Sequence, residues 1–134
     1  MLIAICDDSR IDALLSKTLI IEYCKKHHLS CTVVLYENGS GLLRDIIDGK
    51  RFDIVFMEIY VGQELGIDIA RQLRNVGYEN LLIFSTITDE YAIESYSVKA
   101  NGYILKPYNM PRLENVLDRV LEKYDTDFMR VKVR

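Results

Sequence analysis

The chain has 134 residues, a length that suits one domain and leaves no room for a second complete one. Its 20 Asp and Glu residues outnumber 17 Lys and Arg residues, so the net charge of −3 argues against a nucleic-acid-binding surface, and any DNA contact must come from another segment. No apolar run approaches the roughly 20 residues that cross a bilayer, and no basic region precedes the N-terminal apolar run. We therefore expect a cytoplasmic protein without membrane contacts.

Five strand-like runs alternate with amphipathic segments along the chain. The expected strands cover residues 2–6, 31–36, 52–58, 81–85 and 102–105. Their continuous apolar character is typical of parallel strands that are buried on both faces. The pattern predicts an α/β fold, a doubly wound five-stranded parallel sheet of the flavodoxin-like kind with strand order 2-1-3-4-5 and helices on both faces.

Capping residues and glycines mark the expected helices between these strands. Ser9, Asp89 and Asn109 are suited to begin the first, fourth and fifth helices, whereas Gly49 and Gly77 end the second and third. The expected apolar faces consist of Leu14, Leu15, Thr18 and Leu19 in the first helix, Leu42, Leu43, Ile46 and Ile47 in the second, Ile67, Ala70 and Leu73 in the third, Ala92, Ile93 and Tyr96 in the fourth, and Leu113, Val116, Leu117, Val120 and Leu121 in the fifth.

The last ten residues differ in pattern from the rest. From Phe128 to Arg134 apolar and basic residues alternate, as they do in an exposed strand. We expect residues 1–124 to form the domain and residues 125–134 to be a linker or the start of an output domain outside this sequence. A frayed tail is the alternative.

The cysteines favour free thiols in a reducing compartment, since they are odd in number and a chain of this size needs no disulfides. Cys24 and Cys31 flank His27 and His28, which makes zinc an alternative. The helical pattern at Cys24 and the strand pattern at Cys31 favour a helix end with solvated histidines instead.

Acidic residues end two of the strands. Asp7 and Asp8 follow the first strand, and Glu58 ends the third. These two strands are neighbours at the point where the predicted strand order reverses. Ligands bind at such reversals, and several carboxylates within a few Å must either raise a pKa or bind a cation. Hard oxygen ligands favour magnesium.

Further polar groups are expected at the same edge of the sheet. Ser85 and Thr86 lie at the end of the fourth strand, and Lys106 lies at the end of the fifth. Hydroxyl groups and an ammonium beside a carboxylate-bound cation describe a phosphoryl site. Taken singly, each has a simpler explanation, such as a helix cap for Asp7-Asp8 or a turn at Lys106.

The motifs in this order resemble the receiver domain of bacterial two-component response regulators over about residues 1–124. They are Asp7-Asp8, the run from Phe52 to Glu58, the run from Leu65 to Ala70, the run from Ile83 to Thr86 and the run from Gly102 to Pro107. The segment from Thr86 to Ala92 is most similar to receivers that precede a LytTR-type DNA-binding domain. The resemblance implies a sensor histidine kinase as partner and transcriptional control through a C-terminal DNA-binding domain.

The resemblance also implies a magnesium site. Asp7, Asp8 and Glu58 would hold Mg²⁺, and the backbone carbonyl of Tyr60 would complete the protein ligands. No other cofactor is implied.

Signalling residues follow from the same resemblance. Thr86 and Lys106 would contact the phosphoryl group, Thr86 and Tyr103 would form the switch, and the peptide between Lys106 and Pro107 would be cis. The output surface would consist of helix 4, strand 5 and helix 5. Its mixed charges suit contact with a second copy of the chain, or simply a solvated face: Tyr91, Glu94, Lys99, Arg112, Asp118, Arg119 and Glu122.

One position departs from the family. Glu58 stands where a receiver has its phosphate-accepting aspartate, and Val61-Gly62 replaces the usual Met-Pro. The glutamate carboxylate reaches about 1.5 Å further, and a misplacement of about 1 Å can cost on the order of a hundredfold in rate. Three explanations stay open: a natural receiver with reduced or lost phosphorylation, a substitution that imitates the phosphorylated state, or slow phosphorylation of Glu58.

Two other classes of protein bind their ligands at a similar edge of a parallel sheet. A magnesium-dependent phosphohydrolase of the aspartate-nucleophile class is expected to carry Asp-x-Asp, whereas Asp7 and Asp8 are adjacent. A flavin or dinucleotide carrier is expected to have a glycine-rich loop, but the run from Asn38 to Gly41 lacks a third glycine. We expect a signalling module without enzymatic turnover.

Overall fold

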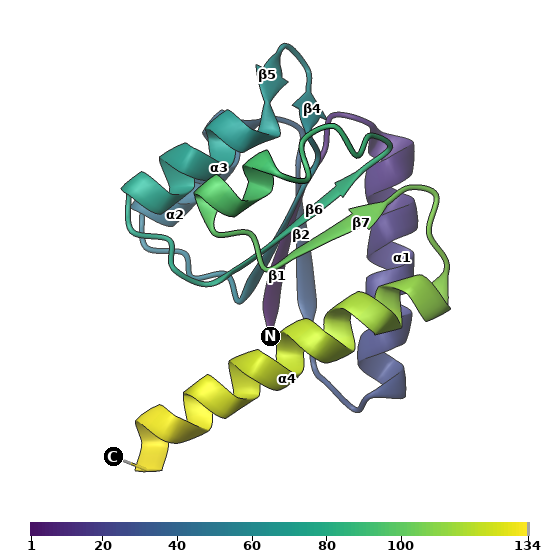
Figure 1. Cartoon of the computed structure of the whole chain (residues 1–134), viewed down its shortest axis with the longest axis vertical. Helices are drawn as coiled ribbons and strands as arrows, with labels where there is room; N and C mark the ends of the chain where they lie inside the picture. Colours follow the sequence, from purple (N-terminus) through teal and green to yellow (C-terminus); the bar gives the residue numbers. More distant parts are fainter. Residues whose placement is uncertain (134) are drawn as a thin grey trace.

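The computed structural model describes residues 1–133, with side chains for residues 1–123. Five parallel strands form one sheet in the order β2-β1-β3-β6-β7 (Figure 1). The strands are β1 (Leu2–Cys6), β2 (Thr32–Tyr36), β3 (Ile54–Met57), β6 (Leu81–Thr86) and β7 (Gly102–Leu105). The predicted α/β class and the predicted strand order are confirmed.

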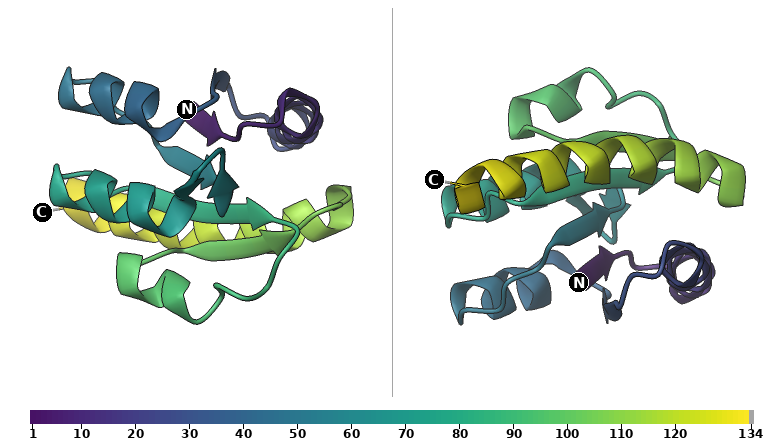
Figure 2. Two further views of the ribbon diagram at one scale, coloured as in Figure 1. Left: turned by 90° about the horizontal axis from the view of Figure 1, so that it is seen from above. Right: turned by 90° about the horizontal axis from the view of Figure 1, so that it is seen from below.

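Helices cover both faces of this sheet. On one face α1 (Arg10–Lys26) and α4 (Met110–Val133) pack against β1, β3, β6 and β7, and on the other lie α2 (Gly39–Ile47), α3 (Gly66–Asn75) and a short 3₁₀ helix, η1 (Glu94–Val98). Figure 2 shows α1 and α2 at one end of the molecule and η1 at the other, as expected from the places of β2 and β7 at the two edges of the sheet. Within the described residues, no helix is both long and apolar enough to span a bilayer.

The first helix begins where the sequence predicted but turns a different face inward. The Ser9 side chain accepts a hydrogen bond from the backbone N–H of Asp12 and so caps α1. Leu14 and Leu15, predicted to be buried, are 42% and 61% exposed. The buried residues are Ala13, Ser16, Ile20, Tyr23 and Cys24. The prediction was wrong because it ranked residues by hydropathy, whereas Ser16 and Tyr23 enter the interior with their hydroxyls hydrogen-bonded to Tyr108 and Asp118.

The predicted fourth helix is not formed as an α-helix. Turns lead from Asp89 into the five residues of η1, and Lys99 ends η1 in a left-handed conformation with φ of 56°. Ile93 and Tyr96, expected to face the core, are 84% and 79% exposed. The segment therefore lacks the buried apolar stripe that stabilises most helices in proteins.

The C-terminal segment is also different from the prediction. Helix α4 continues to Val133, so residues 128–133 are helical and do not form the expected strand. A strand here would need a neighbouring strand for its hydrogen bonds, whereas a helix satisfies its backbone groups internally. Residue 134 and the expected output domain lie outside the described residues.

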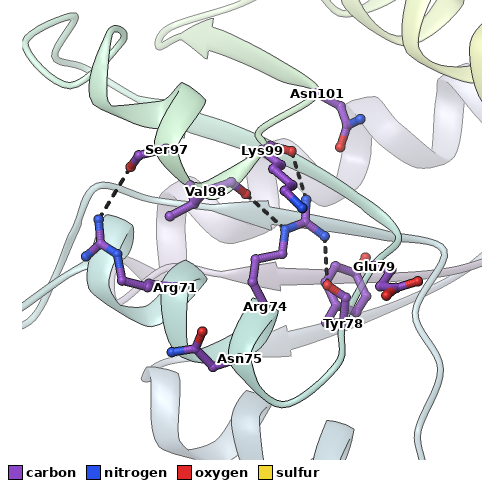
Figure 3. Close-up of a pocket in the computed structure, with 9 residues that line it drawn as sticks. All are labelled: Arg71, Arg74, Asn75, Tyr78, Glu79, Ser97, Val98, Lys99 and Asn101. Carbon is purple, nitrogen blue, oxygen red and sulfur yellow. Dashed lines mark hydrogen bonds between the residues drawn. The ribbon is translucent and has the colours of Figure 1, made fainter.

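Arg74 fastens η1 to the rest of the fold. Figure 3 shows its guanidinium in the pocket between α3 and η1, where it donates to the carbonyl oxygens of Val98 at 2.9 Å, Lys99 at 2.9 Å and Tyr78 at 2.9 Å. A further bond reaches the Asn80 carbonyl at 2.7 Å. Burial lowers the pKa of Arg74 from its ordinary value. One side chain thus connects α3, the end of η1 and the loop before β6.

We expect Arg74→Lys to lower the free energy of unfolding by about 2 kcal/mol, because an ammonium cannot reach four carbonyls at once. Urea unfolding followed by circular dichroism measures this. Arg71→Lys is the matched control, since Arg71 pairs with Asp68 at the surface and should matter by less than about 0.5 kcal/mol. Equal effects of the two substitutions would contradict the assignment.

Candidate functional site

The sheet topology brings the predicted acids together. The ends of β1 and β3 are paired, with Cys6 opposite Met57, so the next residues along the chain, Asp7 and Glu58, emerge side by side. Both are buried, and Lys106, which follows β7, reaches the same place. The three residues come from strands far apart in the sequence, and they meet because parallel strands end at one edge.

A single ammonium group connects the site. The Nζ of Lys106 donates to Asp7 Oδ2 at 2.7 Å, to Glu58 Oε1 at 2.9 Å and to Asp12 Oδ2 at 3.0 Å. The Lys106 side chain is only 8% exposed. We call these four residues the Lys106 cluster. Three carboxylates and one ammonium leave it with a formal charge of −2 when all four are ionised.

The cluster shifts the protonation of its members. Burial lowers the pKa of Lys106, but the hydrogen bonds that its ammonium donates to Asp7, Glu58 and Asp12 outweigh this effect and raise the pKa above the ordinary range of lysine. Burial raises the pKa of Asp7, and the contacts with Lys106 and the Ser9 N–H offset this only in part. The ammonium therefore stays charged at neutral pH, while Asp7 is protonated more readily than an exposed aspartate.

Glu58 uses both of its carboxylate oxygens. While Oε1 contacts Lys106, Oε2 accepts hydrogen bonds from the backbone N–H groups of Ile59 at 2.5 Å and Tyr60 at 3.4 Å. The side chain thus bends back onto its own backbone and still reaches the lysine. No phosphoryl group is needed to bring an anion to Lys106.

A hairpin follows Glu58 and was missed in the sequence. Strands β4 (Tyr60–Val61) and β5 (Glu64–Leu65) pair in antiparallel fashion around Gly62, whose φ is 61°. The base is closed by a hydrogen bond from Gly66 N–H to the Ile59 carbonyl at 2.6 Å. A Cβ at position 66 would lie 1.9 Å from the Glu58 carbonyl oxygen, so only glycine allows this approach.

The other predicted site residues lie around the cluster. Asp8 is exposed at its margin, and the exposed Tyr60 ring packs edge-on against Tyr91 with ring centroids 5.9 Å apart. The predicted switch residues form a second group: the fully buried Thr86 accepts at Oγ1 from the Thr88 N–H at 3.4 Å, and the Tyr103 hydroxyl donates to the Thr88 carbonyl. Thr88 therefore joins the two.

Neighbouring segments agree with other expectations. The peptide between Lys106 and Pro107 is cis, as the resemblance implied. Cys24 and Cys31 are free thiols, His27 stacks on Tyr23 with ring centroids 4.1 Å apart, and no group of three possible metal ligands is found among the described residues. This placement does not favour the zinc alternative.

Sequence reasoning did not include Asp12 or Thr88 in the site. Asp12 looked like an ordinary acidic residue in the first turn of a helix, and Thr88 like part of a loop. A usable signal for Asp12 was present, because a helix that starts directly after Asp7-Asp8 must place its first turn at the same edge of the sheet.

The donor types fit magnesium, although the present arrangement does not enclose a metal. Carboxylates and a main-chain carbonyl are the hard oxygens that Mg²⁺ prefers. Among the described residues, however, no three Asp, Glu, Cys or His side chains are arranged so that they could hold a metal ion, because the three carboxylates of the Lys106 cluster surround an ammonium. The Lys106 ammonium lies between Asp7 and Glu58, and Asp8 is turned to solvent.

The chain belongs to the response regulator receiver domain family, whose model matches residues 3–118. Among its relatives, the sensory transduction protein LytT of Enterococcus faecalis is 26% identical over 99 residues, 74% of this chain and 41% of that protein. The sensory transduction protein LytR of Staphylococcus haemolyticus is 33% identical over 84 residues, 63% of this chain and 32% of that protein. The chain spans less than half the length of these relatives.

Solved structures show the same fold. The N-terminal domain of a response regulator/sensory box/GGDEF protein from Carboxydothermus hydrogenoformans superposes with a TM-score of 0.80 at 23% identity, over 96% of this chain and 99% of that chain. The response regulator TrrA from Thermotoga maritima, solved in complex with Mg²⁺ and BeF, gives 0.74 at 22% identity, over 89% and 97%. The predicted resemblance to receivers of LytTR-type regulators is confirmed, and the role of each site residue stays a prediction.

We expect Lys106→Met to lower the free energy of unfolding by about 3 kcal/mol at neutral pH, because buried carboxylates lose their cation. The raised pKa of Lys106 means that its ion pairs stabilise the folded state fully below the ordinary lysine pKa of about 10.4 and lose this effect as pH rises through the raised value. Urea unfolding between about pH 7 and pH 11 should therefore show a difference from wild type that is constant up to about pH 9.5 and shrinks above about pH 10.4. A variant as stable as wild type at neutral pH would refute the cluster.

Proposed function

We propose that this chain is the signal-input module of a cytoplasmic transcriptional regulator, with a sensor histidine kinase as its input partner. DNA is contacted by a C-terminal output domain outside these residues. Support comes from the receiver family and from relatives named as sensory transduction and transcriptional regulatory proteins, of which this chain spans less than half. The acidic net charge agrees with a module that does not bind DNA itself.

The observation that carries the proposal for the site is the contact between Glu58 and Lys106. In the proposed mechanism Glu58 supplies the anion that a phosphoryl group would otherwise present to the lysine, so phosphorylation is weak, lost or mimicked. Both Glu58 oxygens already accept hydrogen bonds, and the side chain is about 1.5 Å longer than that of an aspartate. Each of these features opposes in-line attack on a phosphodonor.

Magnesium belongs to the proposal as the cofactor. Asp7 and Asp8 would hold it, and Glu58 and the Tyr60 carbonyl would complete the protein ligands. When bound, the metal would supply positive charge that offsets the carboxylates. The formal charge of −2 on the Lys106 cluster supports a further cation at this edge.

Output would pass through the residues that Thr88 joins. Thr86 and Tyr103 both form hydrogen bonds with Thr88. A change of charge beside Thr86 would therefore shift Thr88 and, through it, the position of Tyr103. The proposed output surface, used for a homodimer, consists of η1, β7 and α4. Asp118 is a poor candidate for that contact, because it already accepts a hydrogen bond from Tyr23 of α1 at 2.6 Å.

We do not propose enzymatic turnover. A phosphohydrolase of the aspartate-nucleophile class is expected to carry Asp-x-Asp after its first strand, whereas this chain has adjacent acids there, with Asp7 buried on Lys106 and Asp8 exposed. This divergence agrees with a signalling module.

Treatment with acetyl phosphate and Mg²⁺, followed by intact-mass spectrometry, tests the role of Glu58. We expect no phosphoryl adduct on the wild-type chain, and one adduct on Glu58→Asp, because the shorter carboxylate restores the reach of the family's acceptor.

The control is Glu58→Gln, which keeps the length of the side chain but removes the nucleophile and should gain nothing. An adduct of equal amount on the wild-type and Glu58→Asp chains would contradict the steric argument. Absence of an adduct on Glu58→Asp would count against a phosphoryl site at this edge.

A further inference from the structure

Asp12 is the member of the Lys106 cluster that comes from a helix. Its Oδ2 lies 3.0 Å from Lys106 Nζ, and its side chain is 40% exposed, whereas Asp7 and Glu58 are 5% and 10% exposed. The contact connects the first turn of α1 with the end of β7. Asp12 therefore offers Lys106 a counter-ion at the solvent margin, outside the buried pair.

The position of Asp12 is fixed by the cap of α1. The Ser9 N–H donates to Asp7 Oδ1 at 2.9 Å, and the Asp12 N–H donates to Ser9 Oγ at 3.3 Å. Lys106 then donates to both aspartates, which closes a ring of contacts through Asp7, Ser9, Asp12 and Lys106. This ring connects Asp12 with both the acid at the end of β1 and the lysine.

The charge of Asp12 affects how Lys106 would respond to a bound metal ion. A divalent cation held by Asp7 and Asp8 would repel the Lys106 ammonium, which now lies 2.7 Å from Asp7 Oδ2. If Asp7 and Glu58 were its only partners, the buried ammonium would lose attraction at the moment the metal entered. Asp12 retains an attraction for it on the side that faces solvent.

We propose that Asp12 is a positioning residue for Lys106, which holds the ammonium at the margin of the acid cluster and so strengthens magnesium binding by Asp7 and Asp8. This inference rests on the magnesium site of the proposed function. Removal of Asp12 weakens magnesium binding for two reasons. The site loses one negative charge, and the Lys106 ammonium remains paired with Asp7 and Glu58.

A purely structural role for Asp12 predicts a different result. The pair would then stabilise the start of α1 and leave magnesium affinity unchanged. Magnesium affinity measured beside folding stability separates the two roles, and Asp12→Glu provides a variant that keeps the charge.

The experiment is isothermal titration calorimetry of Mg²⁺ into the full chain at constant ionic strength, with urea unfolding of each variant to verify the fold. We expect Asp12→Asn to raise the Kd for Mg²⁺ by roughly three- to five-fold, the size of one charge interaction near the surface. Asp12→Glu should stay within about two-fold of wild type. Asp68→Asn is the matched control, because Asp68 is an exposed acid paired with Arg71 away from the site.

The outcomes distinguish this inference from the proposed function. A wild-type chain that binds no Mg²⁺, or an Asp8→Ala variant that binds it as well as wild type, would overturn the proposed magnesium site and the role of Asp12 with it. If wild type binds and Asp8→Ala does not, an unchanged or lower Kd for Asp12→Asn would overturn the role of Asp12 alone. So would an equal loss of affinity in Asp68→Asn.

Discussion

One buried ammonium among three carboxylates is the interaction on which this structure depends. Lys106 draws together the ends of β1, β3 and β7 and the first turn of α1. Such a cluster is costly to desolvate, and an ion pair of this kind adds little net stability compared with apolar packing. The cluster instead responds to charge, because any charge added at this edge must redistribute the three ion pairs that Lys106 already forms. Glu58 places a further carboxylate in that arrangement, in direct contact with the lysine.

Much of the fold and part of the site were predictable from the sequence. Continuous apolar runs indicated a parallel sheet, and the known handedness of crossovers left few strand orders. Once β1 and β3 are neighbours, Asp7 and Glu58 must meet, and Lys106 must approach the same edge. The order of the strand ends is enough to place these side chains, and no knowledge of side-chain packing is required.

The remaining features depend on tertiary context. Leu14 and Leu15 are more apolar than Ser16, but hydropathy does not reveal that the Tyr108 hydroxyl donates a hydrogen bond to the hydroxyl of the buried Ser16. The segment before Lys99 has helical composition, yet it forms only turns and η1, and the end of η1 is held by carbonyls bound to Arg74 on another helix. Asp12 joined the site because of where α1 starts relative to β1. The first two cases depend on contacts between residues distant in the chain, which local patterns do not encode, whereas the start of α1 directly after Asp7-Asp8 was a signal that could have been used for Asp12.

The closed base of the β4–β5 hairpin makes its tip a place for a probe. Gly66 holds the strands together at Ile59, so the exposed Gln63 can be replaced without displacing the backbone of Glu58. Burial raises the thiol pKa of the native Cys6 and Cys24 to about 12, which makes both slow to react with thiol reagents. A cysteine introduced at position 63 would then compete for a maleimide dye only with the half-buried Cys31. The attached dye would report optically on changes at the Glu58 carboxylate, from which the hairpin follows.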